Sequence, residues 1–373
     1  IELVKRARER GGTLRVIGSG HSSSEILPTE GTIVRLHRLA GLVDHDREAC
    51  TATLRAGTKL EDVGPELLDV DLAFPNFGDV SSQRVAGAIA TGTHGTGIHY
   101  HNLSNFLIGG RLVTGTGEVL EFSKEDTDLL KALRVAVGTL GVFTEMKLRL
   151  LPAYKLQRRE FCTDYASCME HMDELAAENM HFDFYWYPRS DEVKLRLLNP
   201  PTGGTRDLPY AAMIEDRVGW AHEIIPKHTG IRRHFDECEY HFERKAAVAC
   251  FEEVRKRILE KWRAVAGWRL LYRFAASDDS YLSPCYGRET VTISVHQSAP
   301  LGFWPYFEAM EEIYADYGGR PHWGKKHSLR GEQIRKLYPE FHQFAEVRQR
   351  LDPDGIFLNG YFRELFGLDE GGR

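Results

Sequence analysis

Three glycine-rich runs in the first 150 residues contain the residue types that suit the binding of a dinucleotide. They span residues 16–24, 85–97 and 138–144. Glycine lets backbone N–H groups approach a phosphate closely, and serine and threonine hydroxyls add further donors. One such run alone indicates a tight turn. Three runs in one region together predict a large dinucleotide that is held mainly by the backbone.

The first run contains IGSGHS at residues 17–22 and is neither of the two common phosphate-binding motifs. It lacks the third glycine of the Rossmann fingerprint, and no Gly-Lys-Ser or Gly-Lys-Thr follows it as in a P-loop. His21 lies at the end of the glycine turn, where a neutral imidazole nitrogen is a competent nucleophile. On the residues alone, a loop histidine followed by serines is more typical of a hydrogen-bonded or solvent-facing side chain.

Charged and histidine side chains also interrupt apolar strand patterns. Arg273 lies within LLYRFAA, where a charge is costly unless it is paired or lines a site. His296 in TVTISVHQ is either a core histidine or a pocket residue, and His94 either holds its turn or contacts a ligand. His99 and His101 have the spacing of residues that share one face. No cysteine or carboxylate cluster joins them, so no metal site is predicted.

Three segments far apart in the chain together resemble one family of flavoenzymes. They are IGSGHS (17–22), ATGTHGTG (90–97) and RPHWGK (320–325), and YGR (286–288), SVHQ (294–297) and Asp352-Pro353 add to the likeness. Over nearly its whole length the chain resembles the FAD-linked sugar-1,4-lactone and alditol oxidoreductases of the vanillyl-alcohol-oxidase type. The likeness is to bacterial L-gulono-1,4-lactone oxidases or dehydrogenases and to alditol oxidases.

The resemblance implies an α+β fold with two domains, one that binds FAD and a cap domain that forms the substrate site. It implies that FAD is bonded covalently to His21 through the flavin 8α-methyl group. Arg273 is expected to contact substrate hydroxyls, and Lys325 to lie near the flavin ring, where a fixed cation stabilises developing negative charge. His296 is expected in the same pocket. His322 is either a proton acceptor or a packing partner of Trp323.

Carried over residue by residue, the motifs assign a larger set of positions to the cofactor and the substrate. The catalytic residues expected are Arg273, Lys325, His296 and His322. The residues expected at FAD are Ile17, Gly18, Ser19, Gly20, His21, Ser22, Ser81, Gly87, Ala90, Thr91, Gly92, Thr93, His94, Gly95, Thr96, Gly138, Gly141, Val142 and Asn359. The residues expected at the substrate are Thr96, Leu271, Arg273, His296 and Lys325.

One position departs from the pattern of the family. The family usually carries glutamate two residues before the strand arginine, whereas this chain has Leu271. Residues two apart on a strand share a face, so that glutamate would bind the substrate beside Arg273. We therefore expect the substrate preference to differ from that of typical alditol oxidases.

The activity implied is oxidation of a CH–OH group of a sugar lactone, L-gulono-1,4-lactone or a similar aldonolactone, by hydride transfer to flavin N5. Oxygen or another electron acceptor completes the cycle. One alternative is an alditol oxidase that acts on xylitol- or sorbitol-type polyols and produces hydrogen peroxide. Another is a flavin-binding protein without turnover. A metal-dependent hydrolase is disfavoured by the absence of a ligand cluster from the sequence.

The elements that position these residues change in character at Pro152. Before it, strands are expected at 13–18, 32–36, 49–57, 106–115, 119–122 and 142–151, with helices from Thr58 and after Ser123. Thr58 and Glu61 have the spacing of a capping box. Beyond it, helices are expected at about 164–178, 244–265, 304–317 and 331–350, and strands at 181–188, 268–276 and 290–297. We predict an FAD domain at 1–151, a cap at 152–318, and a segment at 319–373 that returns to the flavin.

Composition limits the remaining classes. The chain has 48 Lys and Arg against 54 Asp and Glu, a net charge of −6 that disfavours general nucleic-acid binding. No apolar run approaches the roughly 18 residues of a membrane span. The six cysteines have no CxxC spacing, with Cys162 and Cys168 in a helical pattern, and they indicate reduced thiols in a cytoplasmic enzyme. Because the chain opens in mid-element without methionine, residues upstream are expected.

Overall fold

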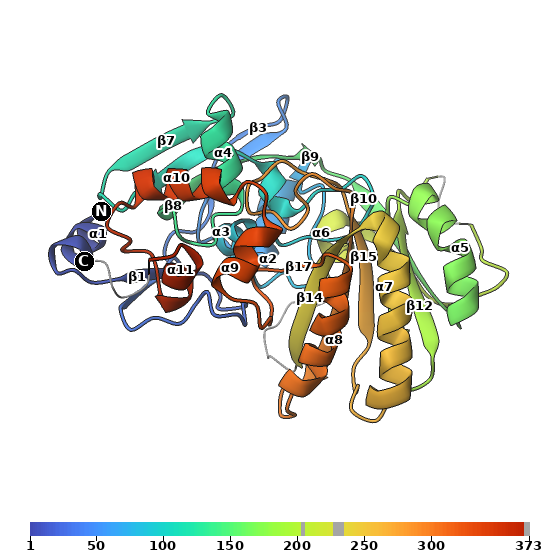
Figure 1. Ribbon diagram of the computed structural model, residues 1–373. Helices are drawn as coiled ribbons and strands as arrows, with labels where there is room; N and C mark the ends of the chain where they lie inside the picture. The colour runs from blue at the N-terminus through green and yellow to red at the C-terminus, as the bar shows by residue number, and fades with distance from the viewer. Residues whose placement is uncertain (203–205, 227–234, 369–373) are drawn as a thin grey trace.

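The computed structural model describes residues 1–202, 206–226 and 235–368, and most of its strands form two antiparallel sheets (Figure 1). The five-stranded sheet has the order β3 (Leu42–Asp46), β4 (Thr51–Arg55), β8 (Val142–Arg149), β6 (Leu107–Val113), β7 (Val119–Ser123). The eight-stranded sheet has the order β13 (Ala212–Trp220), β10 (Lys155–Asp164), β12 (Glu192–Asn199), β11 (His181–Tyr187), β15 (Leu270–Ala275), β16 (Thr290–Ser298), β14 (Phe235–Glu243), β17 (Arg320–Pro321).

Shorter pairings and helices complete the described part of the chain. β1 (Leu14–Ile17) pairs in parallel with β2 (Thr32–Arg35), and β5 (Leu72–Ala73) pairs with β9 (Leu151–Pro152). The α-helices are α1 (Glu2–Glu9), α2 (Leu60–Leu68), α3 (Val85–Ala90), α4 (Thr127–Arg134), α5 (Tyr165–Glu178), α6 (Ala221–Ile224), α7 (Arg244–Arg257), α8 (Trp304–Asp316), α9 (Gly331–Leu337), α10 (Phe341–Leu351) and α11 (Gly360–Leu365). Among the described residues, no helix combines the length and the apolar character needed to cross a bilayer.

The two faces of the eight-stranded sheet differ in chemistry because side chains alternate along a strand. On one face, Phe182, Phe184 and Trp186 of β11 are buried in a core that also takes side chains from α5, α7 and α8. Figure 1 shows these three helices beside the sheet. The opposite face carries charged and polar side chains. Glu237 and Glu239 alternate with the core residues of β14 and line a pocket. This face therefore supplies a wall of the candidate site.

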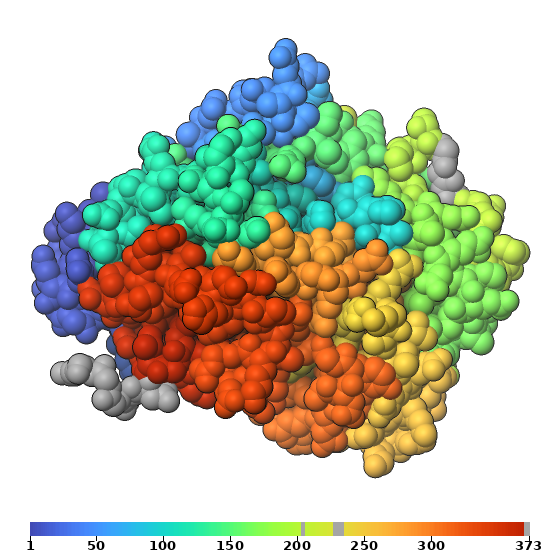
Figure 2. All heavy atoms as spheres, turned by 45° about the horizontal axis from the view of Figure 1, so that its top comes forward, coloured from blue at the N-terminus to red at the C-terminus, as the bar shows by residue number. Residues whose placement is uncertain are grey.

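A second hydrophobic core combines residues from both ends of the chain. Leu14 of β1 is buried in the same cluster as Phe357 and Phe362 near the C-terminus. Figure 2 shows the red C-terminal segment packed beside the teal β6–α4 region and beside the orange segment that precedes it. Because β17 pairs with β14, the segment that we expected to start at residue 319 begins within the eight-stranded sheet.

Several local expectations are wrong. The capping box of Thr58 is absent, because its hydroxyl donates to the Arg55 carbonyl (2.7 Å) and α2 starts only at Leu60. The second glycine-rich run is not a loop over its whole length, because its residues 85–90 form α3. The helix expected over 331–350 is two helices, α9 and α10, which are separated at Pro339, a residue without a backbone N–H to donate.

The region after residue 152 also contains more strands than the sequence analysis assigned. β10, β12, β13 and β14 were not expected, and Cys162 lies in β10 and not in a helix. The helix predicted at 244–265 is α7 followed by a π-helical turn over Ile258–Trp262. All six cysteines are free thiols.

Candidate active site

Two neighbouring pockets meet at the end of the first glycine-rich run. We call the first the glycine-lined pocket; it is lined by residues 18–22 and by Gly87, Ala90, Thr91, Gly138 and Gly141. We call the second the charged pocket; it is lined by β11, β14, β15 and β16 and by the loops of Asp79 and Lys325. The two share His21, Ser22, Gln83 and Thr91.

The glycine-lined pocket fits a dinucleotide. Gly20 and Gly138 have φ of 71°, a conformation that side chains with a Cβ rarely adopt. A Cβ on Gly18 would lie 3.3 Å from the Cβ of Arg84, so the backbone approaches its neighbours closely there. Arg15, which is fully buried, donates to the carbonyls of Gly138 (2.9 Å) and Phe357 (2.6 Å) and fixes the third run.

The two most specific motifs of the resemblance lie against each other, although about 300 residues separate them along the chain. The Ser23 N–H donates to the Gly324 carbonyl (2.8 Å), and the Ser24 hydroxyl donates to the Trp323 carbonyl (2.5 Å). These bonds place Lys325 on the wall of the charged pocket that His21 also lines. The motif match therefore corresponds to one site in space.

Ion pairs across the sheet fix the cations of the charged pocket. Arg273 of β15 lies 2.5 Å from the Glu239 carboxylate of β14 and donates to the His94 carbonyl (3.2 Å). Lys325 pairs with Glu237, whose other oxygen lies 3.4 Å from His296 Nε2. Each predicted cation is thus held by a buried glutamate of β14 that the sequence analysis did not identify.

These pairs keep the glutamates ionised. Burial would raise the pKa of Glu239, but the Arg273 guanidinium and His94 outweigh it and hold that pKa well below its usual range. Lys325 and His296 likewise lower the pKa of Glu237 against the effect of burial. Although burial opposes it, Glu239 raises the pKa of Arg273. Glu239 Oε2 and Arg273 Nε are buried with no hydrogen-bond partner among the described residues, so polar atoms are left for a ligand.

The histidines of the pocket have separate roles. His322 Nδ1 accepts the Gly324 N–H (2.9 Å), so its proton sits on Nε2, and burial lowers its pKa to about 3. His322 is therefore a hydrogen-bond donor and a poor proton acceptor. His94 Nε2 lies 3.1 Å from Glu239, and His322 also lies near that carboxylate, so these three side chains have the ligand types of a metal site. Because Arg273 already balances the charge of Glu239, we assign His94, Glu239 and His322 to the binding of an organic ligand and not of a metal.

Most of the predicted site residues line one of the two pockets, but seven do not. Thr96 donates to the Phe182 carbonyl and accepts the Phe274 N–H (3.2 Å), so it joins a loop to the sheet. Asn359 caps α11 and donates to the Glu25 and Pro28 carbonyls. The residues outside the pocket linings are Ile17, Ser81, Gly92, Gly95, Thr96, Val142 and Asn359.

Other residues of the pockets were missed. Arg15, Arg84 and Val137 line the glycine-lined pocket, Gln83 lines both, and Asp79, Tyr185, Glu237, Glu239 and Arg269 line the charged pocket. A signal existed for the glutamates, since acidic and less polar residues alternate in ECEY over 237–240. Leu271, in contrast, lies on the pocket face beside Arg273 as predicted.

Comparison with known proteins gives a consistent assignment. The family model for D-arabinono-1,4-lactone oxidase matches residues 146–220 and 210–365, and that for an FAD binding domain matches residues 1–123. The chain is 34% identical to L-gulono-1,4-lactone dehydrogenase of Mycobacterium tuberculosis, over 98% of this chain and 93% of that protein. It is 28% identical to L-gulonolactone oxidase of Mus musculus, over 98% and 92%.

Solved structures confirm the fold. A crystal structure of cholesterol oxidase from B. sterolicum superposes with a TM-score of 0.82 at 15% identity, covering 98% of this chain and 92% of that one. It confirms the α+β fold. The match to the FAD binding domain makes FAD the cofactor of the glycine-rich N-terminal part. The chain belongs to the FAD-dependent sugar-1,4-lactone oxidoreductases, the family that the D-arabinono-1,4-lactone oxidase model describes.

Proposed function

We propose that this protein oxidises a CH–OH group of an aldono-1,4-lactone, L-gulono-1,4-lactone or a close analogue. The observation that carries the proposal is the meeting of the glycine-lined and charged pockets at His21, Ser22, Gln83 and Thr91. A dinucleotide held in the first and a sugar held in the second come together there. Bound FAD supplies the two-electron acceptor for the hydride. The similarity to L-gulono-1,4-lactone dehydrogenase over nearly the whole chain supports the choice of substrate.

The chain's own residues would bind, orient and polarise the substrate. Arg273 donates to a substrate hydroxyl, and the Lys325 ammonium stabilises negative charge that develops on the reacting oxygen. Glu239, which is ionised before the reaction, accepts a hydrogen bond from the reacting hydroxyl at Oε2, the oxygen left unpartnered by the described residues. It would take the hydroxyl proton as the hydride leaves and then pass it to water. His322 donates from Nε2, because its Nδ1 already accepts the Gly324 N–H.

The N-terminal part and the C-terminal segment would hold the cofactor, and the intervening part would form the substrate wall. This division follows the predicted domains of 1–151, 152–318 and 319–373. It is supported by the match of the FAD binding domain to residues 1–123 and by the core that joins both chain ends.

His21 is proposed to carry the flavin covalently. Oxygen or another acceptor would regenerate the enzyme. The six free thiols support a cytoplasmic location.

An alditol oxidase remains the alternative, and Leu271 bears on the choice. Leu271 is 4% exposed and lines the charged pocket beside Arg273. An alditol hydroxyl that faces this leucine loses a hydrogen-bond acceptor, whereas a lactone ring can present an apolar edge there. An unpaired buried polar group costs about 1–3 kcal/mol, which corresponds to weaker binding by roughly ten- to a hundredfold.

Leu271→Glu should therefore shift activity toward simple alditols relative to the preferred lactone, by about ten- to a hundredfold in the ratio of kcat/KM. The new carboxylate would lie beside Arg273, which can pair with it and limit the cost of burial. Leu271→Met is the matched control, since it keeps an apolar side chain of similar size. A ratio that is the same in the glutamate variant, the methionine variant and the wild type contradicts contact between this position and the substrate.

The proposed function is tested by a substrate panel. Turnover of aldono-1,4-lactones, xylitol and sorbitol is measured with an electron-accepting dye under nitrogen, and then with oxygen alone. We expect the highest kcat/KM for an aldono-1,4-lactone in the dye assay. The highest value for xylitol or sorbitol, with equimolar hydrogen peroxide in the oxygen assay, would establish the alditol oxidase instead.

A further inference from the structure

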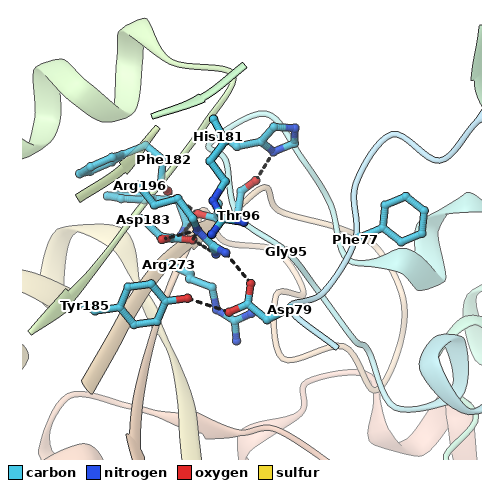
Figure 3. A network of polar contacts seen from close by, with 12 residues as sticks. Phe77, Asp79, Gly95, Thr96, His181, Phe182, Asp183, Tyr185, Arg196 and Arg273 are labelled. Atoms are coloured by element: carbon cyan, nitrogen blue, oxygen red, sulfur yellow. Dashed lines mark hydrogen bonds and ion pairs between the residues drawn. The ribbon is translucent and has the colours of Figure 1, made fainter. Parts of the chain in front are cut away.

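The wall of the charged pocket contains a third carboxylate besides those of Glu237 and Glu239. Asp79 lies in the loop between β5 and α3, and its side chain, 18% exposed, lines the pocket together with Gly78 and Val80. Figure 3 shows its carboxylate pointing toward Arg196 and Tyr185, with the Arg273 side chain beside it. Asp79 therefore faces the same space as the predicted substrate-binding arginine.

Two buried side chains of the sheet hold this carboxylate in place (Figure 3). Arg196 Nη1 of β12 donates to Asp79 Oδ1 (2.6 Å), and the Tyr185 hydroxyl of β11 donates to Oδ2 (2.9 Å). Arg196 is 4% exposed, and Tyr185 is fully buried. A carboxylate fixed by such partners has a defined orientation, as a specific hydrogen-bond acceptor requires. A carboxylate offers about four lone-pair sites, so it can accept bonds from a ligand as well.

The charge on this cluster favours a ligand that donates hydrogen bonds. Arg196 is shared with Asp183, a fully buried neighbour on β11 that accepts its Nε (2.9 Å). One guanidinium therefore faces two carboxylates. Of these three, Asp79 is the member that lines the charged pocket. A sugar hydroxyl that donates to the Asp79 carboxylate would form a charge-assisted hydrogen bond.

Asp79 offers the pocket an acceptor that Leu271 cannot. Tyr185 stands opposite Leu271 in the pairing of β11 with β15, and Asp79, bonded to the Tyr185 hydroxyl, lines the same pocket as both. Leu271 has no polar atom to offer a substrate. We propose that Asp79 is a specificity-determining residue, which accepts a hydrogen bond from an exocyclic hydroxyl of the sugar lactone. This inference rests on the proposed function and adds a contact to it.

The test is a comparison of substrates in an Asp79→Asn variant. The amide can still accept from Arg196, so the wall is kept, but the charge and one acceptor oxygen are lost. Dissociation constants are taken from anaerobic flavin reduction by L-gulono-1,4-lactone and by its 5-deoxy and 6-deoxy analogues. We expect the parent lactone to bind about ten- to a hundredfold more weakly. One deoxy analogue, which lacks the contacting hydroxyl, should change by less than about threefold, and the limiting reduction rate should stay within the same range.

Asp183→Asn is the matched control, because Asp183 shares Arg196 but does not line the pocket. It should not discriminate between the parent lactone and the analogues. If Asp79→Asn does not fold, Tyr185→Phe removes the hydroxyl that orients Asp79 and should show the same substrate pattern at smaller size. Equal losses for all three lactones, or the same pattern in Asp183→Asn, overturn the assignment of Asp79. A wild-type flavin that no lactone reduces overturns the proposed function, and the assignment with it.

Discussion

Flavin reduction in an Arg273→Lys variant should be about a hundred- to a thousandfold slower than in the wild type, while the protein remains folded with FAD bound. Removal of one preorganised donor to developing charge typically costs about 2.7–4 kcal/mol in the transition state. Lysine keeps a positive charge near Glu239 but lacks the planar fork that reaches both Glu239 and the His94 carbonyl. The rate is measured by anaerobic stopped-flow at saturating lactone, with thermal unfolding followed in parallel.

Alanine is the wrong substitution for this test. It would leave Glu239 fully buried without its cation, and breaking a buried pair costs about 3–5 kcal/mol of stability. Arg158→Lys is the matched control, since Arg158 also forms a buried pair in the same sheet, 2.7 Å from Glu160, outside both pockets. A normal reduction rate in folded Arg273→Lys would show that Arg273 is only structural.

His21→Ala should abolish covalent attachment of the flavin. His21 is one of the four residues shared by the two pockets. It follows the glycine turn, which lines the first pocket together with the third glycine-rich run, and the next residues are bonded to Gly324. The imidazole is the group expected to bond to the flavin 8α-methyl. Acid precipitation of the wild type should give a yellow pellet, and that of the variant a colourless pellet with FAD in the supernatant. The fluorescence of the denatured band on a gel gives a second measurement.

His99→Ala controls for loss of a histidine near the second glycine-rich run. His99 is exposed and lines neither pocket, so its variant should precipitate with yellow flavin as the wild type does. A colourless wild-type pellet, with FAD released by acid, would contradict the covalent bond. It would leave the binding of FAD in the glycine-lined pocket unaffected.

The glycine-rich runs that line the first pocket could be recognised in the sequence, because their signals are local. Glycine runs mark the places where the backbone must approach a neighbour closely, and the IGSGHS and HWGK motifs are short enough to recognise. The strand around Arg273 was also predictable, because a period of two places Leu271 and Arg273 on one face. The pocket lining confirms that arrangement.

The partners of the predicted cations could not be derived in the same way. Glu239 lies 34 residues before Arg273, and Glu237 lies 88 residues before Lys325, so only the tertiary structure brings each pair together. Asp79 is still more remote, since its partner Arg196 lies 117 residues later. Thr96 was predicted at the site because of its motif, and here the motif was misleading. Its hydroxyl instead donates to the Phe182 carbonyl and joins a loop to a strand.

Anaerobic mixing of the oxidised holoenzyme with L-gulono-1,4-lactone tests the central claim most directly. The visible absorbance of the flavin should bleach in a single turnover, at a rate that saturates with lactone concentration, and equimolar oxidised lactone should be recovered. Arg273→Lys should bleach about a hundred- to a thousandfold more slowly under the same conditions. A flavin that stays oxidised with every aldono-1,4-lactone, and yet is reduced by dithionite, would contradict the assignment as a sugar-lactone oxidoreductase.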